Sequence, residues 1–344
     1  MISKRQLAAR LFTASGITNL WLRLRRSSRQ EIMVLAYHRI YDIADESSFP
    51  FDPELISAST EAFAWQMEFV RKHFSPISFG ELLEALDHGT PLPPRSLVVT
   101  FDDGHLDNYT NAFPILKSLG VPASIFLSTG YIGGPGTFWF DRLVSLIHHA
   151  PEGELDVAAL SLKLSLGHAT EARRDAAYAI LSRLKRAPNA QRLEVLDQLE
   201  NKLSRHVPVL AADASGAMTW EQVLEMSRGG IEFGSHAVTH PILSMLDDAQ
   251  LHFELSESKR MIEQKTGRQA PVLNYPVGGQ HSFDQRVIAS AKACGYRLGL
   301  SYLPGINYLN TLDRFSIKRL HVERYTTRRD FEAMLALPGL FAKA

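Results

Sequence analysis

Cysteine is almost absent, since Cys294 is the one cysteine among the 344 residues. An internal disulfide is therefore impossible. A structural zinc site built on thiolates is excluded for the same reason, since it needs several of them. Neither sign of charge is in excess, with 37 basic and 37 acidic residues. A surface that binds nucleic acid normally shows a basic excess, so we expect no nucleic acid as a partner.

Long apolar runs are also missing. No stretch approaches the roughly 20 apolar residues of a membrane-spanning helix. The best window for a secretory signal, residues 11–22, is interrupted by five small or polar residues, whereas a signal peptide needs a continuous apolar core. We therefore expect a protein that is cytoplasmic or peripheral to the inner face of the membrane.

Residues 1–30 differ from the rest of the chain, since they carry seven Lys or Arg residues and no acidic residue. Their large apolar side chains fit one face of a helix; these are Leu7, Leu11, Leu20, Trp21 and Leu24. One hypothesis is a basic amphipathic helix in peripheral contact with an anionic membrane. The alternatives are a helix docked on the domain or a mobile tail. The remaining residues, 31–344, are predicted to form one domain.

Short apolar runs recur along that domain and predict buried strands. There are seven of them, at residues 32–37, 96–101, 123–128, 231–235, 272–275, 296–302 and 317–322. Helical patterns separate most of the runs, which indicates βαβ units and a parallel sheet. The fold class is therefore α/β, either an incomplete barrel or a doubly wound sheet.

One long stretch interrupts this pattern. Residues 141 to about 215 are helix-prone and rich in charge, and they show no visible strand pattern. We interpret them as a helical insertion. The aromatic residues at its entrance, Phe138-Trp139-Phe140-Asp141, either pack in a core or line a sugar groove.

The run at 96–101 ends in Asp102, Asp103 and Gly104. An Asp-Gly turn after a strand is common and needs no function. In parallel α/β proteins, however, sites lie at the carboxyl ends of the strands. Side chains alternate along a strand, so one of the two carboxylates can ligate a metal while its neighbour points elsewhere and stays free.

A histidine pair follows a later strand, at His236 and His240. Four-residue spacing would place both on one face of a helix, but Pro241 disfavours the α conformation at His240. A loop at a strand end is the better interpretation. Two imidazoles and one carboxylate, with open positions for water, form a plausible site for zinc or a similar divalent ion.

Together these motifs resemble the polysaccharide deacetylases of carbohydrate esterase family four. Thr100-Phe101-Asp102-Asp103-Gly104 matches the first motif in full. His236-x-x-x-His240 matches the second, with Ala237 where the family prefers Ser or Thr. Tyr275-Pro276-Val277-Gly278 matches a variant of the third, without its preceding arginine. The expected fold is then an incomplete (β/α)7-type barrel with a helical insertion.

The resemblance also implies roles for these residues. A divalent metal, usually zinc, would be held by Asp103, His236 and His240, with Asp102 as the general base. Tyr275 and Pro276 would lie against the substrate, where backbone N–H groups from Tyr275 to Val277 stabilise the oxyanion.

The general acid is harder to place. The resemblance assigns it to a histidine in a late Leu-x-His-type motif, for which Leu320-His321-Val322 is a candidate. Arg319-Leu320-His321-Val322 also fits a family variant in which the strand carries no catalytic histidine. His38 and His281 are the alternatives. The aspartate-tryptophan motif that orients the acid in many members is absent near residues 296–302.

These features predict a metal-dependent hydrolase that removes N-acetyl groups from an acetylated glycan, either a polysaccharide or a glycolipid. One alternative keeps the enzyme class but acts on O-acetyl esters or a cyclic amide. The other is a sugar-binding or scaffolding protein with a degenerate site. The oligomeric state does not follow from the sequence.

Overall fold

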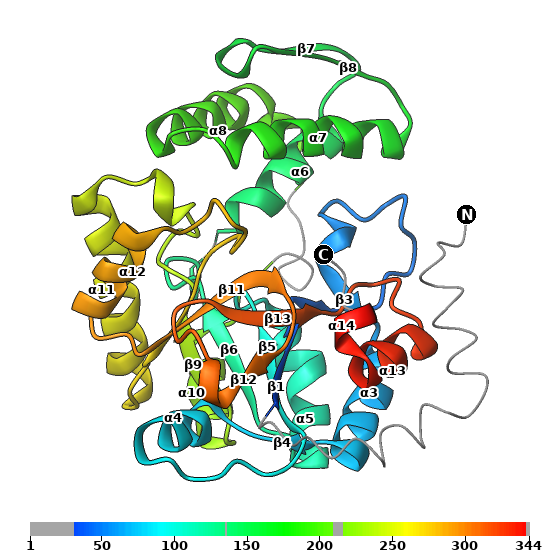
Figure 1. Cartoon of the computed structure of the whole chain (residues 1–344). Helices are drawn as coiled ribbons and strands as arrows, with labels where there is room; N and C mark the ends of the chain where they lie inside the picture. Colours follow the sequence, from blue (N-terminus) through cyan, green and yellow to red (C-terminus); the bar gives the residue numbers. More distant parts are fainter. Residues whose placement is uncertain (1–30, 135, 209–215, 342–344) are drawn as a thin grey trace.

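The computed structural model describes residues 31–134, 136–208 and 216–341. Its centre is a barrel of seven parallel strands with helices around it (Figure 1). The barrel strands are β1 (Glu31–Tyr37), β5 (Ser96–Phe101), β6 (Ala123–Leu127), β9 (Glu232–Ser235), β10 (Val272–Asn274), β11 (Leu298–Pro304) and β13 (Ile317–His321). Each overlaps one of the seven predicted runs, which confirms the predicted barrel.

Pairing between the first two barrel strands closes the structure. β1 is parallel to β5 over six residue pairs, from Ile32↔Ser96 to Tyr37↔Phe101, and on its other side it pairs with β13. A doubly wound sheet would leave these strands unpaired at one edge. Apart from the two strands of the insertion, four shorter strands of the described chain lie outside the barrel: β2 (Arg39–Ile40), β3 (Ile56–Ala58), β4 (Ser75–Pro76) on β5, and β12 (Asn307–Tyr308) on β1.

Helices cover the outer face of the barrel, and their buried side chains form two clusters with strand residues, one that includes Leu35 and Val99 and another that includes Leu273. Capping defines the ends of α11, where Asp247 accepts a hydrogen bond from the Gln250 N–H and Gly267 ends the helix in a left-handed conformation. The helices outside the insertion are α3 (Thr60–His73), α4 (Phe79–His88), α5 (Phe113–Leu119), α10 (Trp220–Arg228), α11 (Asp248–Thr266), α12 (Gln285–Ala293), α13 (Arg328–Ala336) and α14 (Pro338–Phe341).

One helix, α4, closes the amino end of the barrel. Its Phe79 and Leu82 belong to the same buried cluster as Val34, Val98 and Leu300 of the strands. In Figure 1 it lies at the bottom of the view, below the strands. The opposite end, where the strands finish, is left for the site.

The insertion corrects one expectation. It contains α6 (Trp139–His149), α7 (Thr170–Leu184) and α8 (Asn189–Leu203), but also an antiparallel hairpin of β7 (Gly153–Val157) and β8 (Leu162–Leu166). The prediction that this stretch has no strand is therefore wrong. Leu-Lys-Leu-Ser-Leu in β8 alternates apolar and polar residues, which is the period of a half-buried strand.

The insertion has a hydrophobic core of its own, built from α6, the hairpin, α7 and α8. It lies at the top of Figure 1, beyond the carboxyl ends of the barrel strands. Residues 1–30, on which the membrane hypothesis depends, lie outside the described part of the chain. Within that part, no helix combines the length and the apolar character that crossing a membrane requires.

Candidate active site

Polar side chains from five barrel strands meet at the carboxyl end of the barrel. Asp102 and Asp103 follow β5, and the histidine pair follows β9 in a loop, as Pro241 predicted. The other contributors are His38 after β1, Asn274 at the end of β10 and Arg319 in β13.

Asp103, His236 and His240 converge on one point. One ligand atom from each lies within 4.8 Å of the others, and all three residues are buried. The Oδ1 atom of Asp103 is 3.3 Å from Nε2 of His240 and 3.6 Å from Nε2 of His236. That buried oxygen accepts no hydrogen bond from the residues that the structure describes. A buried carboxylate oxygen aimed at two imidazole nitrogens is a donor set that fits a divalent cation.

The protonation states of these groups suit metal binding. Nδ1 of His236 is 2.8 Å from the carbonyl oxygen of Asn274, so it carries the proton and leaves Nε2 with a lone pair. Burial lowers the pKa of His240 to about 3, so its imidazole is neutral at pH 7. Burial would raise the pKa of Asp103, but the His105 imidazole, whose Nε2 lies 3.4 Å from Oδ2 of Asp103, and the imidazoles of His240 and His236 hold it well below its usual range.

The backbone at Asp103 and Gly104 makes the turn that separates the two carboxylates. Asp103 has φ +71°, a left-handed conformation that costs most residues energy. Gly104 follows with φ +92°, and a Cβ there would lie 2.7 Å from Cδ2 of Leu127. Only glycine fits that second position.

Asp102 is held by a different set of partners. Nη1 of Arg319 donates to Oδ1 at 2.7 Å and Nη2 donates to Oδ2 at 2.9 Å, while Nδ2 of Asn274 donates to Oδ1 at 2.7 Å. Burial would raise the pKa of Asp102, but the charge and hydrogen bonds of Arg319 outweigh it and keep the pKa well below its usual range. The carboxylate is therefore ionised and fixed in orientation.

A cavity of about 340 Å³ opens onto these groups. The barrel contributes both aspartates, both histidines, His38, Tyr302 and Arg319 to its lining. The insertion contributes Trp139, Phe140, Leu181 and Lys185, so one wall of the cavity comes from outside the barrel.

The candidate acids lie in different places. Nε2 of His38 is 3.7 Å from Oδ2 of Asp102, and the ring lines the cavity. The ring of His321 stacks on Tyr302, with centroids 3.6 Å apart, and His321 is not among the residues that line the cavity. His281 is exposed, and its carbonyl oxygen accepts a hydrogen bond from Ser244.

Tyr275 and Pro276 lie at the end of β10, and both are buried. The Tyr275 hydroxyl turns away from the site and donates to the carbonyl oxygen of Phe315 at 3.1 Å. The backbone N–H of Tyr275 donates to the carbonyl oxygen of Leu300, and Pro276 has no N–H. The Val277 N–H has no acceptor among the residues that the structure describes, and Val277 lines the cavity.

Comparison with known proteins agrees with this geometry. The family profile described as polysaccharide deacetylase matches residues 89–163 and 182–299, which is more than half of the chain. The chain belongs to this family. The resemblance that the motifs predicted is therefore confirmed.

Relatives are similar over limited stretches. The poly-beta-1,6-N-acetyl-D-glucosamine N-deacetylase of Escherichia coli (strain K12) is 36% identical over 91 residues, which cover 26% of this chain and 13% of that protein. The enzyme of the same name from Staphylococcus epidermidis (strain RP62A) is 29% identical over 112 residues, covering 30% of this chain and 38% of that protein. The chain thus spans less than half the length of these curated relatives.

Solved structures support the fold. The deacetylase PplD of Streptococcus pyogenes, in complex with acetate, superposes with a TM-score of 0.59 at 18% identity, covering 92% of this chain and 100% of that one. IcaB from Ammonifex degensii gives a TM-score of 0.56 at 17% identity, covering 92% and 98%.

Two residues of this polysaccharide deacetylase site were missed from the sequence. Arg319 lies 217 positions beyond Asp102 and donates two hydrogen bonds to it. Arg319 stands between Lys318 and Leu320 in a predicted strand, and a charged residue inside a strand could have indicated a buried ion pair. Asn274 binds both Asp102 and His236; a polar residue that ends an apolar strand just before Tyr275 could have indicated it.

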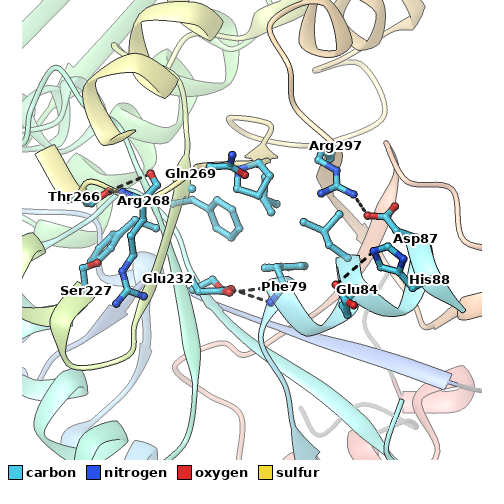
Figure 2. Close-up of a pocket in the computed structure, with 18 residues that line it drawn as sticks. Phe79, Glu84, Asp87, His88, Ser227, Glu232, Thr266, Arg268, Gln269 and Arg297 are labelled. Carbon is cyan, nitrogen blue, oxygen red and sulfur yellow. Dashed lines mark hydrogen bonds and ion pairs between the residues drawn. The ribbon is translucent and has the colours of Figure 1, made fainter. Parts of the chain in front are cut away.

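A second cavity, of about 360 Å³, lies at the amino end of the barrel beside α4 (Figure 2). Figure 2 shows Glu232 pointing toward the start of α4, where its oxygens accept hydrogen bonds from the N–H groups of Phe79 and Gly80. Ser124 Oγ donates to the same carboxylate at 3.0 Å. Each oxygen of Glu232 thus accepts at least one hydrogen bond, and the carboxylate stabilises the helix terminus.

Proposed function

We propose that this chain is a zinc-dependent hydrolase that removes N-acetyl groups from an amino-sugar polysaccharide or glycolipid. The observation that carries the proposal is the convergence of Asp103, His236 and His240 beside Asp102, a second carboxylate held ionised by Arg319. Two of the relatives described above are named for deacetylating poly-beta-1,6-N-acetyl-D-glucosamine. That polymer is the first substrate to test.

The carboxylates of Asp103 and Asp102 would have different roles, metal binding and proton transfer. Asp103, His236 and His240 would hold the metal, which when bound polarises the acyl carbonyl and makes a water more acidic. Asp102 would take the proton from the attacking water, because it is ionised and lies at the cavity wall. Its bidentate contact with Arg319 would keep the carboxylate in one orientation during that transfer.

For the general acid we propose His38 in place of His321. An acid must reach the leaving amine inside the cavity, and His38 lines it whereas His321 stacks on Tyr302. Burial lowers the pKa of His38, and the Asp102 carboxylate, whose Oδ2 lies 3.7 Å from Nε2 of His38, opposes that shift. The Val277 N–H is our candidate for the oxyanion, since the N–H of Tyr275 is already bonded within the barrel.

The membrane hypothesis for residues 1–30 stays a proposal. Their seven basic and no acidic residues support contact with anionic lipid. Co-sedimentation with vesicles of anionic lipid should fall when residues 1–30 are deleted, and equal binding of both chains would contradict the proposal.

Acetate release from β-1,6-linked N-acetylglucosamine oligomers tests the reaction. We expect activity with zinc, its loss on chelation, and its recovery when zinc is returned. Asp102→Asn should lower turnover by about 10²- to 10⁴-fold and still bind zinc, because it removes the base and keeps the ligands. A zinc-loaded chain that is inactive on all N-acetylated amino sugars, but active on O-acetyl esters, would contradict the proposal.

A further inference from the structure

The loop that carries the two histidines, residues 236–240, has a strained backbone. Ala237 has φ +66° and His240 has φ +54°, and neither is glycine. Such left-handed residues are strained and persist only where their surroundings fix them. The contacts that fix this loop therefore also determine where the His240 imidazole lies.

The barrel supplies one set of contacts. The Glu254 carboxylate of α11 accepts hydrogen bonds from the N–H groups of Val238, at 2.6 Å, and Thr239, at 2.9 Å. The Thr239 hydroxyl donates to its other oxygen at 2.5 Å. These bonds hold the middle of the loop, and they leave the carbonyl group of His240 to other donors.

The insertion supplies those donors. Nε1 of Trp139 in α6 donates to the carbonyl oxygen of His240 at 3.1 Å, and Nη1 of Arg192 in α8 donates to the same atom at 3.4 Å. The Arg192 guanidinium lies over the Trp139 ring, 4.9 Å from its centroid. The Phe140 ring lies 5.0 Å from the His240 ring. Three side chains of the insertion thus contact one metal-ligand candidate.

Arg192 is unusual for packing alone. It is 2% exposed, and its other N–H groups donate to Oδ1 of Asn189 and to no carboxylate within the described ranges. Glu254 acts on this guanidinium through its charge and not through a hydrogen bond. Burying a guanidinium that no carboxylate contacts is costly, so an apolar residue would serve packing alone better. The hydrogen bond from Nη1 of Arg192 to the His240 carbonyl oxygen gives the buried guanidinium a role beyond packing.

We propose that Trp139 and Arg192 are positioning residues, through which the insertion holds His240 in the conformation that binds the metal. The inference rests on the proposed function, because it assumes that His240 is a ligand. It assigns the insertion a part in the metal site beyond forming a cavity wall. Removing either donor should weaken metal binding without unfolding the barrel.

The test measures zinc affinity of the full chain by competition with a chromogenic chelator. Trp139→Phe removes the indole N–H and keeps an aromatic ring under Arg192, and Arg192→Met removes the second donor. We expect each change to weaken zinc binding about tenfold, as for other outer partners of metal ligands. Leu193→Ala is the matched control, because this neighbouring α8 side chain is 52% exposed and should leave the affinity unchanged.

Thermal unfolding of the zinc-free and zinc-loaded chains separates positioning from packing. We expect Trp139→Phe to leave the zinc-free Tm nearly unchanged and to reduce the rise in Tm that zinc produces. Zinc affinity within twofold of the parent chain for Trp139→Phe would overturn the inference and leave the proposed function intact; this variant decides even if Arg192→Met does not fold. A parent chain that binds no divalent metal would overturn both.

Discussion

The two ends of the barrel hold cavities of nearly equal size, about 340 Å³ at the carboxyl end and about 360 Å³ at the amino end. Both have a carboxylate from a strand or strand end in the wall. At the amino end, Glu232 accepts three hydrogen bonds. At the carboxyl end, the buried Oδ1 of Asp103 accepts none and faces two imidazoles. The two cavities therefore differ little in volume; they differ in whether the carboxylate oxygen in the wall has a hydrogen-bond donor among the described residues.

The largest effect should come from removing the unsatisfied oxygen itself. Asp103→Ala takes away one of three ligands, and we expect zinc binding and deacetylase activity to fall to background. Zinc content after gel filtration and acetate release measure the two effects. Asp102→Asn is the control that should lose activity but keep zinc. A zinc-loaded, active Asp103→Ala chain would show that the comparison identifies the wrong carboxylate.

The next effect concerns the satisfied carboxylate at the same end. Arg319→Met leaves Asp102 buried without its counter-charge, and we expect a loss of about 3–5 kcal/mol of stability at pH 7. Arg319 depresses the folded-state pKa of Asp102, so its stabilisation is present above the unfolded pKa of about 4 and is lost as the pH falls toward the folded value. The difference between the two chains should therefore shrink between pH 5 and pH 3.

Urea unfolding at these pH values measures the difference. Arg314→Met is a matched control, because Arg314 pairs with Asp87 at the surface and is 38% exposed. It should cost at most about 1 kcal/mol. Equal losses for the two arginine variants would mean that the Arg319–Asp102 pair is no stronger than an ordinary surface ion pair.

The contact of Arg319 with Asp102 could not be predicted from the sequence, although much of the fold could. The seven strands were predictable because buried parallel strands form short apolar runs, and Asp102, Asp103, His236 and His240 follow directly from the strand ends. The contact between Arg319 and Asp102 depends on barrel closure through β1, which no local pattern contains. The hairpin of β7 and β8 was different, since the alternation in β8 was visible but was outweighed by the helical composition around it.

A third, smaller effect belongs to another unsatisfied carboxylate at the carboxyl end. Both oxygens of Asp141, in α6, are buried without a hydrogen-bond partner. Burial raises the pKa of Asp141 to about 6, above the unfolded value of about 4. Its protonated form therefore favours folding below pH 4, and that contribution is lost as the pH rises through 6.

Asp141→Asn should consequently be more stable than the parent chain at pH 8, by up to about 3 kcal/mol, and show little gain at pH 4. Thermal unfolding at both pH values measures this. Asp175→Asn, in α7 of the same insertion, controls for a general charge effect because Asp175 is exposed. If the stability difference between Asp141→Asn and the parent chain were the same at both pH values, the pKa of Asp141 would not be raised by burial. The carboxylate would then have a hydrogen-bond partner in solution, such as water.

The smallest effect should come from the amino end, where Glu232→Gln replaces one acceptor oxygen by an amide NH₂ that cannot accept from the N–H groups of α4. We expect a stability loss of about 1–2 kcal/mol. Deacetylase kcat/KM per folded molecule should stay unchanged, because the cavity in Figure 2 lies at the opposite end of the barrel from Asp103. Unfolding in urea and acetate release measure the two quantities separately. A tenfold fall in kcat/KM with unchanged stability would remove the distinction between the two ends, because it would make Glu232 part of the reaction.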